Sequence, residues 1–190
     1  MRCFIAIELP QDIKESISSL IDKLRHISRG IRWVPVENIH LTIKFLGEVK
    51  EDLIPEIEKR LSSICMNHGS FNIAVHRTGA FPNFKYPNVL WIGTDESEEL
   101  KGLHKDIDES MSGLGFEKED RRFSPHFTMG RVRDGKGIES ILKDLYTMKD
   151  NFFGSMAVNE ILLMKSVLKP TGAEYSKIAV FKLEKGNSLD

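Results

Sequence analysis

The order of strand and helix patterns repeats along the chain, and this repeat constrains the fold more than any other feature. Residues in corresponding patterns lie 86 positions apart: Cys3 and Val89, His40 and His126, Val89 and Tyr175. Residue identity is barely kept, so the order of the elements is what recurs. Two similar lobes related by a pseudo-twofold axis account for this order, and they would place equivalent strands on opposite sides of one cleft.

Hydrophobic periodicity locates the repeated elements. Apolar residues at helical spacing predict helices over residues 13–27, 53–64, 100–114 and 138–148. Alternation predicts strands over residues 2–9, 38–47, 71–81, 88–95, 124–132, 156–164 and 175–183. The final residues, 186–190, are typical of a loose tail.

Composition narrows the class of protein. With 190 residues and 41% hydrophobic content, the chain can bury a core of its own, and we expect a monomer. A net charge of -1 provides no field for non-specific binding to nucleic acid, so a polyanionic substrate must meet a local site. Two cysteines without a CxxC pair, and no apolar segment suited to secretion or to a membrane span, predict a cytoplasmic protein.

A His-x-Thr motif occurs at residues 40, 76 and 126. In a strand the histidine and the threonine share one face, and a single such pair is typical of buried polar groups that bond to their surroundings. HLTI (40–43) and HFTM (126–129) carry apolar residues between the polar ones and fall at the repeat offset. The motif at residue 76 does neither, so we interpret it as structural.

Two imidazoles and two hydroxyls facing one cleft suit a phosphodiester. An ordinary histidine pKa near 6.5 lets one ring accept a proton from water while the other donates one to the leaving oxygen. Thr42 and Thr128 would hydrogen-bond to the non-bridging oxygens. Other chemistries have less support, because neither strand offers a suitable Ser or Cys nucleophile, two distant histidines make a poor zinc site, and no phosphate-binding glycine motif is present.

These motifs resemble those of the two-histidine (2H) phosphoesterases, and within them the RNA 2',3'-cyclic phosphodiesterases, also called 2'-5' RNA ligases. HLTIKFLG and SPHFTMGRV match the two H-x-T-x motifs, while MRCFIAIELP, GAFPN with VLWIG, and KSVLKPTGAEY resemble the opening, middle and closing segments. The resemblance implies an α+β fold that is bilobal, a pseudo-twofold duplicated unit with antiparallel sheets flanked by helices around a central cleft. Residues 1–190 would form a single domain of two lobes, approximately 1–86 and 87–190, with interleaved ends.

The resemblance also implies the chemistry. His40 would be the proton donor and His126 the proton acceptor in hydrolysis of a terminal 2',3'-cyclic phosphate to a 2'-phosphate, without a metal or other cofactor. The substrates would be RNA ends or small nucleoside 2',3'-cyclic phosphates, and the same groups would support reversible 2'-5' ligation. A non-catalytic nucleotide- or RNA-binding module with the same cleft is the alternative, and a structural role for both motifs is a third interpretation.

Residues beside the motifs allow further expectations. In a regular strand Lys44 shares the face of His40, which suggests a phosphate contact, although a solvated lysine at the strand end fits equally well. Arg131 falls on the face opposite His126, which predicts a structural role. Arg121, Arg122 and Phe123 precede the second motif, where either a nucleotide contact or a rim position is consistent with their chemistry.

Overall fold

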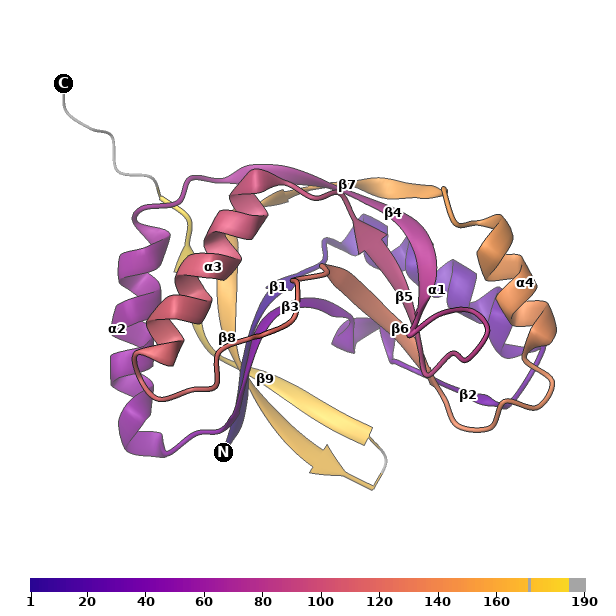
Figure 1. Ribbon diagram of the computed structural model, residues 1–190, viewed down its shortest axis with the longest axis horizontal. Helices are drawn as coiled ribbons and strands as arrows, with labels where there is room; N and C mark the ends of the chain where they lie inside the picture. Colours follow the sequence, from indigo (N-terminus) through magenta and orange to yellow (C-terminus); the bar gives the residue numbers. More distant parts are fainter. Residues whose placement is uncertain (171, 185–190) are drawn as a thin grey trace.

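The structure, a computed structural model, describes residues 1–170 and 172–184 (Figure 1), so the predicted tail lies outside the described residues. Along the chain the elements are β1 (Arg2–Glu8), α1 (Gln11–Arg25), β2 (Ile31–Trp33), β3 (His40–Glu48), α2 (Ile54–Cys65), β4 (Phe71–Phe81), β5 (Val89–Thr94), α3 (Glu98–Ser112), β6 (His126–Val132), α4 (Glu139–Thr147), β7 (Phe152–Val158), β8 (Glu160–Lys169) and β9 (Gly172–Lys182). None of the helices among the described residues is long and apolar enough to cross a membrane.

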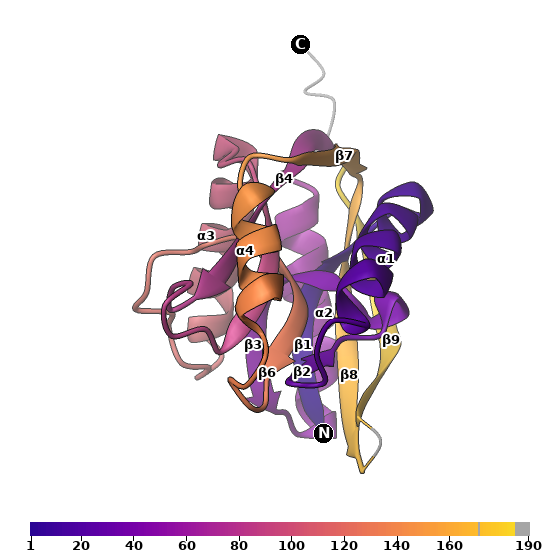
Figure 2. The same ribbon diagram turned by 90° about the vertical axis from the view of Figure 1, so that its right-hand side faces the viewer.

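The strands pair antiparallel in the order β7-β4-β5-β6-β3-β1-β8-β9, with β2 beside β6. Only one residue pair, Leu41 with Phe127, joins β3 to β6, and it divides the sheet into two parts. We call β3, β1, β8 and β9 with α2 and α3 the first lobe. The second lobe comprises β7, β4, β5, β6 and β2 with α1 and α4, and it faces the viewer in Figure 2. The predicted bilobal α+β fold is confirmed.

Each lobe contains elements from both halves of the chain. In the second lobe α1 packs against β7, and β4 pairs with β5. In the first lobe α3 packs against β3, and β8 pairs with β1. The two repeats therefore exchange one helix and two strands, α1, β2 and β4 for α3, β8 and β9, so neither lobe is a continuous stretch of chain.

The helices bury their apolar faces against one side of the sheet. On α1 the buried side chains follow the predicted stripe: Ile13, Ile17, Leu20, Ile21 and Leu24. Ser97 caps α3, because its hydroxyl accepts the Leu100 amide proton over 3.0 Å, a contact worth about 1 kcal/mol. Ile5 and Ile7 of β1 belong to the same core, whereas Phe4, the residue before Ile5, points to the other face. That other face carries the polar residues of the two motifs.

One predicted strand is wrong. Residues 156–164 do not form a single strand, because β7 ends at Val158 and β8 begins at Glu160. The two strands then belong to different lobes, with β7 beside β4 and β8 beside β1. The spacing from Val89 to Tyr175 is likewise no symmetry relation, since β5 lies inside the sheet and β9 at its edge.

Candidate active site

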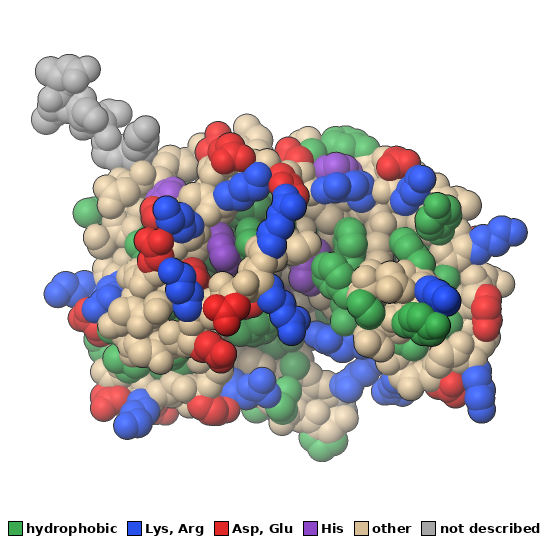
Figure 3. Space-filling model, in the orientation of Figure 1, with side chains coloured by type: hydrophobic (Ala, Val, Ile, Leu, Met, Phe, Trp, Pro, Cys, Tyr) green, Lys and Arg blue, Asp and Glu red, His purple; other side chains and the backbone are tan. Residues whose placement is uncertain are grey.

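The two motif strands, β3 and β6, pair with each other near their N-terminal ends. Leu41 and Phe127 pair with each other and are fully buried. Extending this antiparallel register sets His40 opposite Thr128 and His126 opposite Thr42. These four side chains therefore leave the face opposite the core. Figure 3 shows a histidine side chain at the centre of this view, between the two lobes. The structure thus brings the two motifs together.

His40 is held by its neighbours in one orientation. Its Nδ1 lies 2.8 Å from the carbonyl oxygen of Asn38. A carbonyl only accepts, so Nδ1 carries the proton and Nε2 is the nitrogen left for chemistry. The ring stacks on Phe4 with centroids 4.7 Å apart and meets the edge of Tyr175 at 5.2 Å. Aromatic packing therefore fixes the plane of the ring, and the backbone fixes its tautomer.

His126 repeats this arrangement in the second lobe. Its Nδ1 lies 2.7 Å from the carbonyl oxygen of Ser124, which leaves Nε2 for chemistry here as well. Phe81 meets the ring edge-on at 4.8 Å, and Trp91 lies 6.4 Å away. Sequence reasoning missed Asn38 and Ser124, because a backbone carbonyl has no side-chain signature. Their separation nevertheless matches the repeat offset.

Both histidines titrate below their ordinary value of 6.5. Burial lowers the pKa of His40, and the hydrogen bond to Asn38 only partly opposes this effect. Burial likewise lowers the pKa of His126, the bond to Ser124 opposes it, and the positive charge of Arg131 lowers it further. Each ring is consequently neutral in the free protein at pH 7, and a bound anion would favour the charged form.

The two threonines retain free hydroxyls. Thr42 and Thr128 are both half-buried, and neither hydroxyl has a hydrogen-bond partner within the described part of the chain. These two are available to an oxyanion placed between the histidines.

A β-bulge follows each threonine and changes which face the next residues occupy. On β3 the register with β1 shifts between Lys44 and Thr42, so Ile43 is the extra residue. On β6 the register with β5 shifts between Gly130 and Thr128, which makes Met129 the extra residue. The bulges thus repeat at the same offset as the histidines. Neither of them was predicted.

The predicted position of Lys44 is wrong because of the first bulge. Its side chain points into the protein and is only 6% exposed. The ammonium group donates to the Asp108 carboxylate and, over 2.7 Å, to the Glu117 carbonyl oxygen. Phe45 instead occupies the face that carries His40; it is 71% exposed, and its ring centroid lies 6.1 Å from that of Phe4.

Arg131 also lies opposite to its predicted face. Beyond the bulge at Met129 it returns to the side of the strand that carries His126, and it is exposed. Burial is the main cause of the lowered pKa of His126, and the positive charge of Arg131 adds to it. Alternation in a regular strand missed this residue, although its positive charge in the second motif was a signal.

Lys44 and Asp108 anchor the loop that leads to His126. Lys44 binds the Glu117 carbonyl, and an Asp108 carboxylate oxygen accepts the Glu119 amide proton over 3.2 Å. Burial raises the pKa of Asp108, but the hydrogen bonds from Lys44 and Glu119 together outweigh it and hold the pKa below its ordinary value. A buried pair in the first lobe thereby positions the segment that ends in Ser124.

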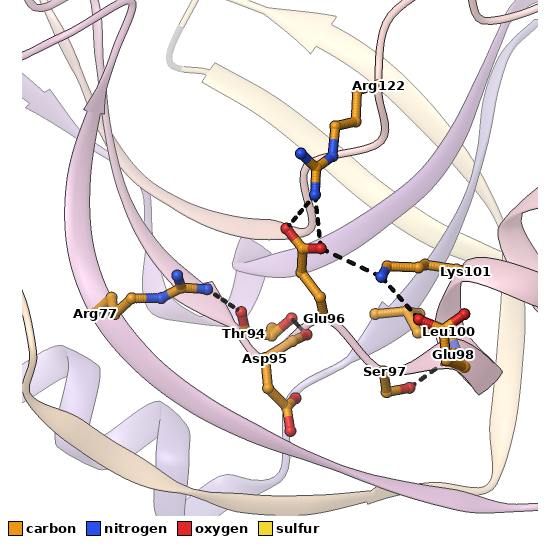
Figure 4. Close-up of polar contacts among 9 residues, drawn as sticks. All are labelled: Arg77, Thr94, Asp95, Glu96, Ser97, Glu98, Leu100, Lys101 and Arg122. Carbon is orange, nitrogen blue, oxygen red and sulfur yellow. Dashed lines mark hydrogen bonds and ion pairs between the residues drawn. The ribbon is translucent and has the colours of Figure 1, made fainter.

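Arg122 and Phe123 hold the same loop through contacts of their own. Arg122 binds both carboxylate oxygens of Glu96, at 2.8 and 2.7 Å, beside the capped start of α3 (Figure 4). Phe123 stacks on His104 with ring centroids 3.9 Å apart. Both side chains thus hold the loop against α3 rather than standing free at the rim.

In the third His-x-Thr pair the threonine is structural, as predicted. The Thr78 hydroxyl is buried and donates to the carbonyl oxygen of Leu145 at the end of α4. It fastens α4 to β4 and has no part in the hollow between the lobes.

Comparison with known proteins gives a consistent picture. The model of a family described as LigT-like phosphoesterases matches residues 7–91 and again residues 92–175. An RNA 2',3'-cyclic phosphodiesterase of Methanocaldococcus jannaschii is 38% identical over 178 residues, which is 94% of this chain and 98% of that protein. The crystal structure of TT0787 of Thermus thermophilus superposes with a TM-score of 0.84 at 26% identity, covering 98% of this chain and 100% of that one. Escherichia coli LigT complexed with 3'-AMP superposes with a TM-score of 0.73 at 26% identity over 96% of this chain and 97% of that one.

Proposed function

Since the chain belongs to the LigT-like phosphoesterase family, we propose that it is an RNA 2',3'-cyclic phosphodiesterase that leaves a 2'-phosphate at the RNA end. The observation that carries this proposal is the matched state of His40 and His126. Each ring commits Nδ1 to a backbone carbonyl and keeps Nε2 for the space between the lobes. Binding alone needs no second proton-transfer group, whereas in-line displacement at phosphorus needs two.

The proposed reaction uses one histidine on each side of the phosphorus. Nε2 of His126 takes a proton from water, and the hydroxide oxygen bonds to phosphorus while the bond to O3' breaks. Nε2 of His40, protonated at the start, gives its proton to O3'. The histidines finish with their protonation states exchanged, and solvent resets them. The same ring opening, with an RNA 5'-hydroxyl in place of water, yields a 2'-5' bond.

Other groups in the cleft suit the substrate's charge and shape. Thr42 and Thr128 would donate hydrogen bonds to the two non-bridging oxygens, whose negative charge grows in the transition state. Arg131 lies on the same face of β6 as His126, and its guanidinium would attract the phosphate. Phe45 offers an exposed ring on the far side of Phe4 from the core, on the face that carries His40, where the base of the terminal nucleoside would stack.

The product isomer tests the activity and the polarity of the site together. In EDTA we expect the protein to convert adenosine 2',3'-cyclic phosphate into the 2'-phosphate alone, resolved by liquid chromatography. Among the described residues no three His, Cys, Asp or Glu side chains gather as metal ligands, and the proposed steps need none. Appearance of the 3'-phosphate, or activity that requires an added divalent cation, would contradict the mechanism. Affinity for the cyclic nucleotide without any product would identify a non-catalytic binding module.

The depressed histidine pKa values predict an acidic optimum for kcat/KM. The active free enzyme carries one proton shared between His40 and His126, and this form is most populated midway between their pKa values. Both pKa values lie below 6.5, so kcat/KM should reach its maximum below pH 6.5. At higher pH it should fall, and the decrease should approach tenfold per pH unit. A pH series with the cyclic nucleotide measures this profile, and a kcat/KM that stays level up to pH 8 would refute it.

We infer further that residues 1–190 act as one domain, with the repeats 1–86 and 87–190 interleaved, and that the chain works as a cytoplasmic monomer. In support, one chain supplies both histidines of the site. Cys3 and Cys65 are free and buried, and burial raises the pKa of Cys65 to about 12. Such unreactive thiols suit a reducing compartment.

A further inference from the structure

The second lobe exposes a group of aromatic rings that the proposed reaction does not use. Tyr86, in the connection from β4 to β5, is 65% exposed, and Tyr146 of α4 is 55% exposed. Phe84 lies between core and solvent, and its ring meets that of Tyr146 edge-on with centroids 5.6 Å apart. We call these three rings, with Lys85 and Lys149, the aromatic surface. Adjacent exposed rings of this size mark interaction sites more often than scattered ones do.

The aromatic surface is held in place by its own backbone. The Asn83 side-chain oxygen accepts the amide protons of Lys85 and Tyr86 over 2.9 and 3.0 Å. This turn fixes the direction of the chain after Phe81, while Phe84 anchors it on the core. A partner would therefore meet rings that are already ordered, which reduces the entropy lost on binding.

Positive charge accompanies the rings. The Lys85 Nζ lies 5.3 Å from the Tyr86 ring centroid, and the Lys149 Nζ lies 5.2 Å from that of Tyr146. Within the described ranges neither lysine forms an ion pair with an acidic side chain. Rings that stack on bases, next to cations that meet phosphates, are the combination that binds single-stranded nucleic acid.

The aromatic surface continues from the His126 side of the site. Phe81 contacts the His126 ring and precedes Phe84 by three residues, so their α-carbons lie at most about 11 Å apart. That span corresponds to about three stacked nucleotides at 3.4 Å each. Figure 3 shows hydrophobic side chains extending from a histidine across the right-hand lobe, with basic side chains among them.

The direction of the reaction decides which RNA strand reaches this surface. In-line displacement places the incoming oxygen beside His126 and the ribose with its leaving O3' beside His40. The strand that ends in the cyclic phosphate then extends over the first lobe, away from the aromatic surface. We propose that the aromatic surface binds the 5' end of a second, single-stranded RNA, whose 5'-hydroxyl replaces water as the nucleophile. This inference rests on the roles proposed above for His40 and His126.

The covalent step balances as a reversible exchange. The 5'-hydroxyl gives its proton to His126, the O5'-phosphorus bond forms, the phosphorus-O3' bond breaks, and O3' takes the proton from His40. In the reverse step O3' attacks phosphorus, the bond to O5' breaks, and the RNA with the free 5'-hydroxyl leaves from the aromatic surface. Cleavage of 2'-5'-linked RNA therefore reports on the aromatic surface without the need to drive ligation in water.

The test uses 2'-5'-linked oligoribonucleotides with one, three or six nucleotides on the 5'-oxygen side. For the wild type we expect kcat/KM to rise at least tenfold from one to six nucleotides. Tyr86→Ala/Tyr146→Ala should abolish this rise and leave hydrolysis of adenosine 2',3'-cyclic phosphate within twofold of wild type. Tyr86→Phe/Tyr146→Phe keeps the rings and should keep the rise. The inference would be overturned if kcat/KM rose equally with length in the wild type and the alanine variant. It would also be overturned if the alanine variant lost only a rise that comes from added nucleotides on the 2'-oxygen side of the linkage.

Binding provides a readout that does not depend on turnover. Binding is measured with a fluorescent hexaribonucleotide that has a free 5'-hydroxyl, in the inactive variant His40→Ala/His126→Ala. Adding Tyr86→Ala/Tyr146→Ala to this variant should weaken binding at least tenfold. Lys85→Gln/Lys149→Gln should reduce the slope of log K against log salt by about 1.4 for two lost phosphate contacts. Lys50→Gln/Lys59→Gln, on the first lobe, is the matched control and should leave the slope unchanged. If the cyclic nucleotide is not hydrolysed, the proposed function is wrong, but this measurement still tests whether the aromatic surface binds RNA. If the tyrosine substitutions do not weaken binding, only the inference about the aromatic surface is wrong.

Discussion

Replacing His40 or His126 by alanine should slow the opening of adenosine 2',3'-cyclic phosphate by about 100- to 10,000-fold, the usual contribution of a positioned proton-transfer group. Each ring is packed against aromatic neighbours on β-strands, so both variants should remain folded and bind the nucleotide. Single-turnover rates and circular dichroism check the two statements. His26→Ala, an exposed histidine after α1, is the control and should retain full activity.

A change of leaving group separates the two roles. A nitrophenyl phosphodiester releases an oxygen that needs no proton, so His40→Ala should lose far less activity on it than on the cyclic nucleotide. His126→Ala should lose activity on both substrates, because water must be deprotonated in each case. The double variant should be little worse than the more damaged single variant, since the two groups act as a unit. An opposite pattern would exchange the assignments of donor and acceptor.

Lys44→Met should destabilise the protein by about 3–5 kcal/mol, because it leaves the Asp108 carboxylate buried without its partner. Asp108 is only 5% exposed, so water cannot replace the lost ammonium group. Urea unfolding measures the change from the shift of the midpoint. Lys59→Met, at an exposed position of α2, is the matched control and should change stability by less than about 0.5 kcal/mol.

The double variant Lys44→Met/Asp108→Leu tests the cause. Removing both charges should recover at least half of the lost stability, since an apolar pair replaces a buried ion pair at little cost. Full recovery is not expected, because the Glu117 carbonyl and the Glu119 amide both lose a partner. A single variant that loses less than about 1 kcal/mol would show that the pair does not hold the loop.

The sequence specifies the placement of the two motif histidines better than that of their neighbours. His40 and His126 could be found because the duplication places the same motif at two positions 86 residues apart. Leu41 and Phe127, the pair that joins the two motif strands, have the same separation. Lys44 and Arg131 could not be placed, because alternation assumes an unbroken ladder and each strand is bulged just before them. Neither extra residue, Ile43 or Met129, is a glycine or proline that would mark a bulge.

The split of residues 156–164 has a similar cause. β7 and β8 are both apolar and separated only by Asn159, so periodicity shows one strand. Their separation follows from which partners they find, β4 in one lobe and β1 in the other. Pairing over such distances in sequence is a tertiary property that local patterns do not encode.

The exchange of α1, β2 and β4 for α3, β8 and β9 bears on how such a chain can arise. A polypeptide with a single repeat would leave β1 without its neighbour from the other half, and its own last strand would have no sheet to join. Two copies could satisfy each other by mutual swapping, with the dimer axis at the contact that Leu41 and Phe127 make here. Such an ancestral homodimer would already present two histidines across one cavity, and fusion of its genes would then free each motif to specialise, one as acid and one as base.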